Sequence, residues 1–380
     1  MASEDHNLHE LLNFALLKQD YELLEFSLKE HLFLSRQPTG TIPTNHKEVR
    51  PILLRALSEI KIPEIKEIYS KGTLATAFAS TILWLLRDFP ILVVDPSDPD
   101  LKKLATPFFT NFFDRSAQIQ HTLQEQNEKL KERRYPAQVR MEGNLPLFYI
   151  EGEERSHYKD DRFSMPVEKL SPAALLRPLF QDFIFPTLAY VGGPAEIAYF
   201  AQLHPWYDVM QIKQPWLLHR ASVTLIPPIT RSFLDSRHLC PEELFMKEDT
   251  LFDALVENSA LNQIRAKLKE LQEQVDKGLS ESSGAADKIE KTLRKNIETS
   301  QRKIRYQLQK IDRKAFYAVK RKDQILYGQL RKAKNVIYPE DKPQERYLNV
   351  FSFAARLPDL LAQVYPRIEV DSREHLWVDI

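Results

Sequence analysis

The sequence predicts an α/β protein, with a parallel-sheet core followed by an antiparallel pair of long helices that forms a coiled coil. Short strands that alternate with helical segments predict the core, because such alternation is typical of parallel sheets. A heptad pattern of apolar residues predicts the coiled coil. We divide the chain into a partial core with a helical insertion (1–135), a small antiparallel β insertion (136–170), the second half of the core (171–240), a helical hairpin (241–340) and a C-terminal segment (341–380).

The composition is that of a folded protein without a charge bias. The 380 residues are 43% hydrophobic and 28% charged, and the formal net charge is +0. This balance favours neither nucleic acid nor a membrane as a partner, and no apolar run is long enough for a membrane helix. The single cysteine, Cys240, excludes an internal disulfide and a multi-cysteine zinc site. It fits a reducing cytoplasm, and we expect its thiol to be buried and inert.

The first half of the chain predicts helices around one short strand. Helical patterns cover 7–34, 47–87 and 100–133, and the apolar run 91–94 predicts a buried strand that ends at Asp95-Pro96. The alternating stretch 136–165 predicts antiparallel strands. There is no signal-peptide pattern at the start of the sequence.

Two of the nine glycines in the chain stand side by side, at Gly192-Gly193, between a predicted strand (187–191) and a helix that begins at Pro194. A two-residue turn of this kind predicts unusual dihedral angles, which glycine adopts without a Cβ clash. Proline suits the first helical turn, and the Glu196 carboxylate favours the helix dipole. The turn also lies where open α/β sheets bind ligands, because glycines let a ligand approach the backbone N–H groups. A second strand is predicted within 215–226.

The region after residue 244 predicts the hairpin. Leu261, Leu268 and Val275 belong to a heptad seam, a turn is predicted near 278–286, and a longer second arm follows. Residues 287–335 contain 16 basic and 5 acidic residues. We interpret this arm as a solvated helix face and consider nucleic acid an unlikely partner, because no aromatic platform accompanies the charges.

Two sequence blocks carry a family resemblance. "LLRPLFQDFIFPTLAYVGGPAEIAYFAQL" and "ASEDHNLHE" resemble signature blocks of the cysteine-adding enzymes of bacillithiol biosynthesis, a family of cysteine ligases. "LVVDPSDPDLKKL", the strand near Arg220 and Ser222, and the heptad hairpin follow in the family's order, so the resemblance covers essentially the whole chain.

The resemblance implies a Rossmann-like core similar to class I aminoacyl-tRNA synthetases, with connective insertions and a C-terminal coiled coil. The implied reaction joins L-cysteine to glucosaminyl-malate through an amide bond, with ATP as the expected cosubstrate and no metal beyond a nucleotide-bound Mg²⁺. Family members have further N-terminal residues that include the first Rossmann strand. We therefore expect this chain to lack that part, to be less stable than an extended form, and to be catalytically silent or nearly so.

Candidate site residues lie in the two signature blocks and on the following strand. We expect Asp5 and His6 to act as acid–base or substrate-contacting groups, since histidine titrates near neutral pH. A metal site with His9 and Glu10 has too few ligands. The expected substrate- or nucleotide-binding residues are Ser3, Glu4, Arg177, Gln181, Asp182, Gly192, Gly193, Pro194, Glu196, Tyr199, Arg220 and Ser222.

Each of these residues also has a purely structural interpretation. Arg177 is suited to a carboxylate or phosphate, or it forms a surface ion pair with Asp182. Glu196 is suited to an ammonium group, or it only offsets the helix dipole. Arg220 and Ser222 are expected on one side of their strand, with Arg220 as a second anion ligand.

Three functions are consistent with the sequence. The first is the ligase, as a homodimer through the coiled coil, and the second is an inactive or partial ligase-like protein that acts as a coiled-coil interaction module. The third is a nucleic-acid binder that uses the basic arm.

Overall fold

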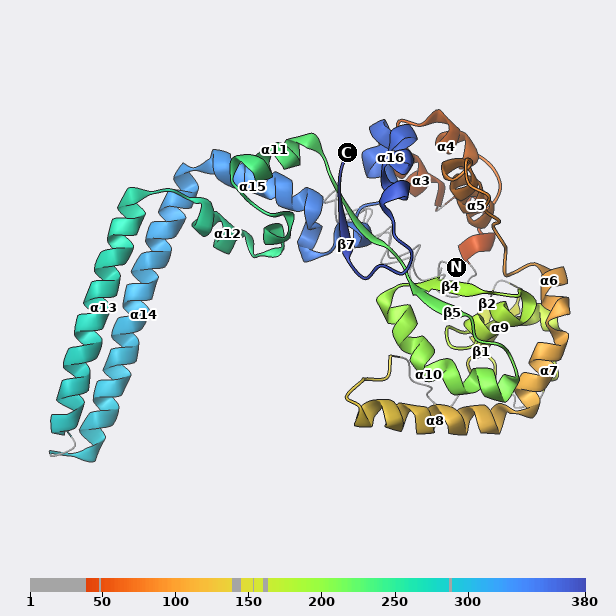
Figure 1. The fold of residues 1–380 in the computed structure, drawn as a ribbon, viewed down its shortest axis with the longest axis horizontal. Helices are drawn as coiled ribbons and strands as arrows, with labels where there is room; N and C mark the ends of the chain where they lie inside the picture. The colour runs from red at the N-terminus through yellow and green to blue at the C-terminus, as the bar shows by residue number, and fades with distance from the viewer. Residues whose placement is uncertain (1–38, 48, 139–144, 153, 160–162, 287–288) are drawn as a thin grey trace. The chain divides into compact units, whose positions relative to one another are not determined.

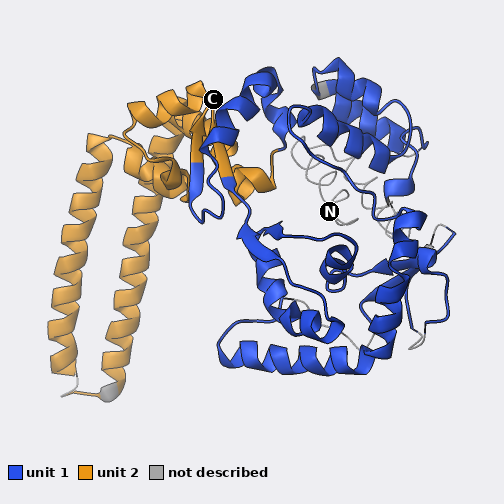
Figure 2. Ribbon diagram, turned by 45° about the vertical axis from the view of Figure 1, so that its right-hand side comes forward, with its two compact units in different colours: residues 1–222, 349–376 blue, residues 223–348, 377–380 orange. Residues whose placement is uncertain are grey.

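The computed structural model describes residues 39–380 except 48, 139–144, 153, 160–162 and 287–288 (Figure 1). The predicted helix over 7–34 lies outside the described residues. The chain divides into two compact units: residues 1–222 with 349–376, and residues 223–348 with 377–380 (Figure 2). In the described part of the chain no helix is both long and apolar enough to span a bilayer.

The first described part of unit 1 is helical. It consists of α3 (Val49–Glu59), α4 (Pro63–Ile68) and α5 (Leu74–Leu85). Thr73 caps α5: its hydroxyl accepts from the backbone N–H of Thr76, whose own hydroxyl accepts from the N–H of Thr73. This reciprocal pair satisfies two of the N–H groups that a helix start leaves without intrahelical partners.

The strand predicted over 91–94 is wrong. Residues 91–94 pair with no strand among the described residues, and Leu92 is 84% exposed. An apolar run becomes a strand only where a neighbouring strand and a packed face receive it. The neighbouring ring of Phe89 instead packs edge-on against Tyr365, with 4.8 Å between the ring centroids.

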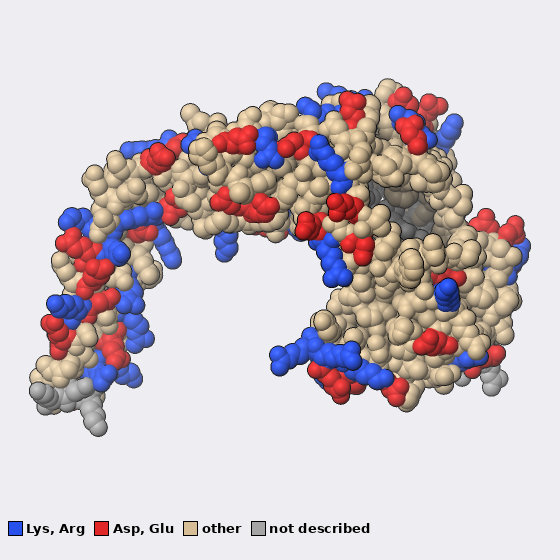
Figure 3. All heavy atoms as spheres, in the orientation of Figure 1, with Lys and Arg blue, Asp and Glu red and all other residues tan. Residues whose placement is uncertain are grey.

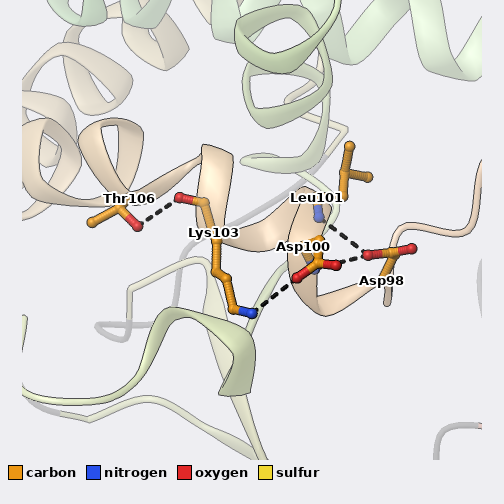
Figure 4. A network of polar contacts seen from close by, with 5 residues as sticks. All are labelled: Asp98, Asp100, Leu101, Lys103 and Thr106. Atoms are coloured by element: carbon orange, nitrogen blue, oxygen red, sulfur yellow. Dashed lines mark hydrogen bonds and ion pairs between the residues drawn. The ribbon is translucent and has the colours of Figure 1, made fainter.

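Three helices follow: α6 (Pro99–Leu104), α7 (Thr106–Asp114) and α8 (Ser116–Glu132). Asp98 caps α6, because its Oδ1 accepts from the backbone N–H groups of Asp100 and Leu101 (Figure 4). The amine of Lys103 contacts the Asp100 carboxylate at 2.9 Å. Helix α7 supplies the centre of the unit 1 core with four buried phenylalanines: Phe108, Phe109, Phe112 and Phe113.

A three-stranded antiparallel sheet covers the next stretch. It has the order β2-β1-β3, with β1 (Leu147–Glu151) between β2 (Glu154–His157) and β3 (Leu170–Pro172). Phe148 faces His157 on one side and Ser171 on the other. Leu147 and Leu170 are fully buried, so the sheet packs into the core that contains α7.

The signature block folds as helix, strand, turn and helix. Helix α9 (Arg177–Ile184) leads to β4 (Ala189–Gly192), and α10 (Pro194–Met210) begins directly after Gly193. Strand β4 pairs in parallel with β5 (Trp216–His219), with Gly192 opposite His219. Helix α10 packs on α8, where the buried indole N–H of Trp206 donates to the Ile119 carbonyl at 2.9 Å. Strands β4 and β5 form a parallel pair, and a larger parallel sheet stays a prediction.

Unit 2 has its own core. Strands β6 (Ser222–Ile226) and β7 (His375–Asp379) form a two-stranded sheet. The unit's shorter helices are α11 (Pro228–Ser236), α12 (Glu248–Leu255) and α15 (Gln324–Ile337). Leu234, Phe252, Leu330 and Ile337 are among the buried residues that join them. Helix α16 (Leu357–Val364) belongs to unit 1, and the 3₁₀ segments are Thr39–Thr41, Val167–Lys169, Pro241–Phe245, Pro339–Asp341, Gln344–Arg346, Val350–Arg356 and Tyr365–Arg367.

Two long helices, α13 (Ser259–Ala286) and α14 (Lys291–Lys322), lie side by side and run in opposite directions (Figure 1). Arg265 near the start of α13 pairs with Asp312 near the end of α14, at 2.8 Å. Asp276, further along α13, pairs with Arg305 at 3.0 Å.

The turn predicted near 278–286 is wrong, because α13 continues through both of its glycines to Ala286. A glycine in a helix costs about 1 kcal/mol relative to alanine. Packing along α14 and cooperative helix propagation offset that cost here. Cys240 was expected to be buried, but its thiol is exposed.

Candidate functional site

The Gly192-Gly193 turn joins the carboxyl end of β4 to α10, as the sequence predicts, but the reason for its glycines differs. Gly193 has φ −70° and ψ 166°, which any residue adopts. Gly192 is likewise absent from the residues with positive φ. The expectation of unusual dihedral angles is therefore wrong, and the glycines supply space rather than backbone freedom.

The space at the turn lies next to the Arg220 side chain. A Cβ at Gly193 would lie 3.4 Å from Nη2 of Arg220 and 3.5 Å from Oε2 of Glu196. A Cβ at Gly192 would lie 3.2 Å from the Tyr190 ring and 3.3 Å from the Ile197 side chain. Both glycines are buried. Because neither has a side chain, Arg220 and Glu196, which carry opposite charges, can lie close to the backbone at this point.

Two hydrogen bonds fix the turn. The backbone N–H of Gly193 donates to Oε2 of Glu196 at 2.7 Å, so the third residue of α10 satisfies one N–H group at the helix start. The backbone N–H of Arg220 donates to the Gly192 carbonyl at 2.9 Å. The second bond extends the β4–β5 pairing by one residue, and it brings Arg220 to the glycine turn.

Arg220 and Ser222 do not share one strand, contrary to expectation. The predicted strand breaks at Arg220 and Ala221, which separates β5 from β6. The Ser222 hydroxyl lies 2.8 Å from Nδ1 of His375. The backbone N–H of His219 donates to the Asp371 carboxylate at 2.9 Å. The break lets Arg220 turn to the glycines, while Ser222 contacts the C-terminal segment.

Aromatic side chains line the core side of the turn. Tyr190 on β4 and Tyr199 on α10 both contact the ring of Phe200, at centroid distances of 4.8 Å and 5.6 Å. Burial raises the pKa of the Tyr199 hydroxyl, and the nearby Glu196 carboxylate raises it further. The Arg177 charge lowers the same pKa, which places the α9 guanidinium within electrostatic reach of Tyr199. Burial also raises the pKa of Tyr190. Both phenols are therefore neutral hydrogen-bonding groups near neutral pH.

Asp182 is buried rather than paired with Arg177 on the surface. Its residue is 9% exposed, and its Oδ2 accepts from the Tyr207 hydroxyl at 2.7 Å. Burial raises the pKa of the Asp182 carboxyl, although the bond from Tyr207 acts in the opposite direction. No ion pair joins Asp182 to Arg177 within the described residues, so the proposed surface pair is wrong. Asp182 therefore supports α9 and α10 from inside.

The structure thus brings together Gly192, Gly193, Pro194, Glu196, Tyr199 and Arg220, with Arg177 in electrostatic reach of Tyr199, whereas Asp182 lies in the interior against Tyr207. Gln181 lies on α9, where its carbonyl accepts from the N–H of Phe185 at the helix end. Ser3, Glu4, Asp5 and His6, with His9 and Glu10, lie outside the described residues. In the remainder of the chain no three His, Cys, Asp or Glu side chains gather in an arrangement that could hold a metal ion.

Tyr190 and Tyr207 were missed by the sequence analysis. Burial raises the pKa of both hydroxyls. Two signals could have found them. Tyr190 precedes Gly192 by two residues and so points to the same face of its strand. Tyr207 follows Tyr199 by eight residues, a spacing that keeps two side chains on one helix face.

Comparison with protein families assigns the two parts of the chain to a class: a Rossmann-like N-terminal domain followed by a C-terminal coiled-coil domain. The N-terminal Rossmann-like domain of the bacillithiol biosynthesis protein BshC matches residues 1–167 and 162–221. The C-terminal coiled-coil domain of the same protein matches residues 223–380. The chain therefore belongs to the BshC family of bacillithiol biosynthesis, and the resemblance seen in its signature blocks is confirmed.

Curated relatives agree over most of the chain. Three proteins with the name "Putative cysteine ligase BshC" come from Koribacter versatilis, Prosthecochloris aestuarii and Solibacter usitatus. They are 29%, 26% and 27% identical to it over 94%, 98% and 99% of this chain. The matched regions are 71%, 74% and 75% of the relatives' own lengths.

Proposed function

We propose that this chain is a ligase of bacillithiol biosynthesis, which adds L-cysteine to glucosaminyl-malate through an amide bond. Family membership supports the reaction class, and the turn at Gly193 supports the site. The observation that carries the proposal is the convergence of Arg220 and Glu196 on two side-chain-free residues at a helix start. Carboxylates, phosphates and amines, the groups that such a reaction handles, fit charges of both signs beside a backbone without side chains.

Amide formation needs an activated carboxyl, and we propose that ATP supplies the activation, with Mg²⁺ carried by the nucleotide. Arg220 and the start of α10 would hold an anionic group, either phosphate or carboxylate. Glu196 already caps the helix, so an anion at the N–H of Gly193 must displace its Oε2. Glu196 is then released toward the amine of cysteine or of glucosaminyl-malate. We further propose that Asp5 and His6 act as acid–base groups and that the reaction takes place in the cytoplasm.

A coupling assay tests the function. The chain is incubated with glucosaminyl-malate, cysteine and ATP, and the amide product is measured by mass. We expect product only in the complete mixture, and we expect loss of product when ATP is omitted. Product without ATP would contradict nucleotide-dependent activation, and absence of product from a folded chain would contradict the ligase.

The runner-up function is an inactive ligase-like protein that acts as a coiled-coil interaction module. Half-exposed apolar residues on α13, Ile264 and Leu271, favour it, because such positions suit a partner helix. The two functions separate cleanly: the module assembles through α13 without turnover, whereas the ligase forms product.

A further inference from the structure

The charges of the hairpin are unevenly divided between its two helices. Helix α14 contains twelve lysines and arginines and two acidic residues, whereas α13 contains four of each sign. In Figure 3 basic side chains follow the α14 side of the hairpin. The excess positive charge therefore belongs to one helix and is not neutralised by its neighbour.

The basic residues of α14 lie on one face. Steps of seven and four residues return to nearly the same side of a helix. Such steps connect the residues within each of two adjacent rows, and we call the two rows together the basic stripe. One row contains Lys295, Arg302, Tyr306, Arg313, Tyr317 and Arg321, and the other contains Lys303, Lys310 and Lys314. From Lys295 to Arg321 the stripe is about 39 Å long at 1.5 Å per residue.

The stripe faces away from α13. Side chains of the opposite α14 face make the hairpin contacts: Gln301 and Arg305 bind Asp276, Asp312 binds Arg265, and Leu308 is buried. The two acidic residues of α14, Glu298 and Asp312, lie outside the stripe. No stripe lysine or arginine forms an ion pair within the described part of the chain, so these charges are available to a ligand.

Aromatic rings interrupt the stripe, which the sequence analysis did not recognise. Tyr306 is 57% exposed and Tyr317 is 45% exposed. A shallow groove of ≈ 390 Å³ lies around the first ring, lined by Thr299, Arg302, Lys303, Tyr306 and Gln307. The Tyr317 hydroxyl donates to Asp249 at 3.2 Å, which holds that ring in place. Proteins that bind single-stranded nucleic acids use exposed aromatic rings between cations, because bases stack on the rings and phosphates contact the cations.

We propose that the basic stripe of α14 binds single-stranded nucleic acid. The cations contact successive phosphates along the helix, and a base stacks on Tyr306 in the groove. An anionic membrane fits less well, because a surface helix inserts its apolar face into the lipid, and part of the apolar face of α14, including Leu308 and Phe316, is buried within unit 2. This surface is separate from the glycine turn and does not depend on the proposed ligase activity.

Fluorescence anisotropy with a labelled oligouridine of about 20 nucleotides tests the proposal, since that probe is longer than the sites of such proteins. Binding should weaken steeply as salt rises from about 50 to 200 mM. The slope of the logarithm of the association constant against the logarithm of the salt concentration is negative. The triple variant Lys303→Gln/Lys310→Gln/Lys314→Gln should make that slope shallower by about 2, because three phosphate contacts are lost. Tyr306→Ala should weaken binding at least about fivefold, while Tyr306→Phe retains it.

The matched control is Lys267→Gln/Lys269→Gln/Lys277→Gln, which removes three exposed charges from α13. It should leave binding nearly unchanged, because those lysines lie off the stripe. Equal loss in both triple variants would overturn the proposal, as would no salt-sensitive binding by the parent chain. Binding to vesicles rich in phosphatidylserine without binding to RNA would assign the stripe to a membrane instead. Equal affinity for a duplex, unaffected by Tyr306→Ala, would contradict the single-stranded ligand.

Discussion

At the scale of single residues, Asp182 shows that packing can override the environment that a sequence pattern suggests. One of the two interpretations of the sequence placed Asp182 in a surface ion pair with Arg177, whereas the structure buries it against Tyr207. Sequence spacing gives the face of a helix but not the depth of the layer that covers it. Burial of Asp182 depends on α9 and α10 lying together, which no local pattern reports.

The buried carboxyl of Asp182 predicts a pH-dependent stability. Its pKa is raised from 3.8 because burial disfavours the charged form. A raised carboxyl pKa contributes stability that is fully present below the unfolded value and is lost as pH rises through the folded value. We therefore expect Asp182→Asn to gain stability relative to the parent chain as pH rises above 3.8. Urea unfolding at several pH values measures the difference.

Tyr207→Phe is the companion variant. It removes the hydrogen bond that lowers the pKa of Asp182, so the loss of stability with pH should extend to higher pH. At neutral pH it should cost about 1–3 kcal/mol, because a buried carboxylate oxygen loses its partner. A stability difference between Asp182→Asn and the parent chain that does not change with pH would show that Asp182 titrates normally.

Substitution of Gly193 by alanine should change ligand binding without destabilising the fold. Its backbone angles suit any residue, and a Cβ would meet only ordinary contacts. Alanine at such a position restricts the unfolded chain, so Gly193→Ala should be neutral or should stabilise the fold by up to about 1 kcal/mol. The same Cβ enters the space beside Arg220, and ligand binding should weaken. Thermal unfolding and nucleotide titration of one sample distinguish the two effects, and a large destabilisation would contradict the backbone angles seen at Gly193.

At the scale of elements, helices and strands with strong local sequence signals could be predicted, and those with marginal signals could not. The helix from Pro194 and the strand before Gly192 follow from the proline, the glycines and the apolar run. The run 91–94 has the same strand composition, but pairing depends on a distant partner, and none lies beside it among the described residues. Residues 278–286 contain two glycines and three serines, yet packing along α14 outweighs that local preference for a turn.

The glycines of α13 give a test of that correction. A Cβ at Gly278 or Gly284 meets nothing within 4 Å, and both residues are helical. Each substitution by alanine should therefore stabilise unit 2 by about 1 kcal/mol, the usual difference in helix propensity. Thermal unfolding followed by circular dichroism measures the gain. If these residues formed the turn that the sequence predicted, alanine would bring no such gain.

At the scale of the whole molecule, the Rossmann-like N-terminal domain and the C-terminal coiled-coil domain were both predictable and are confirmed by the family match. The heptad seam and the signature blocks carried that prediction. The roles of Ser3, Glu4, Asp5 and His6 stay predictions, because they lie outside the described residues. The homodimer that was expected from the coiled coil also stays a prediction, since heptads serve hairpins and dimers alike.

We predict that the hairpin forms a homodimer through α13. Ile264 and Leu271 are 41% and 48% exposed and lie in one groove with Leu268. Light scattering at micromolar concentration should give twice the mass of one chain. The double variant Ile264→Glu/Leu271→Glu should reduce the measured mass to that of a single chain. The control, Lys269→Glu with Lys277→Glu, changes charge on the same helix and should remain dimeric. A monomeric parent chain would rule the dimer out.

The central claim is that the Gly193 turn is the ligand site of a cysteine ligase, and the rate of amide formation by Gly193→Val tests it most directly. Valine adopts the observed backbone angles, but its methyl groups fill the space between the turn and Arg220. With the fold intact by circular dichroism, we expect the parent chain to form product from cysteine, glucosaminyl-malate and ATP. The variant should be slower by about 100-fold, since small misplacements in a site have effects of this size. Equal rates would show that the turn is only structural and that the site lies elsewhere in the chain.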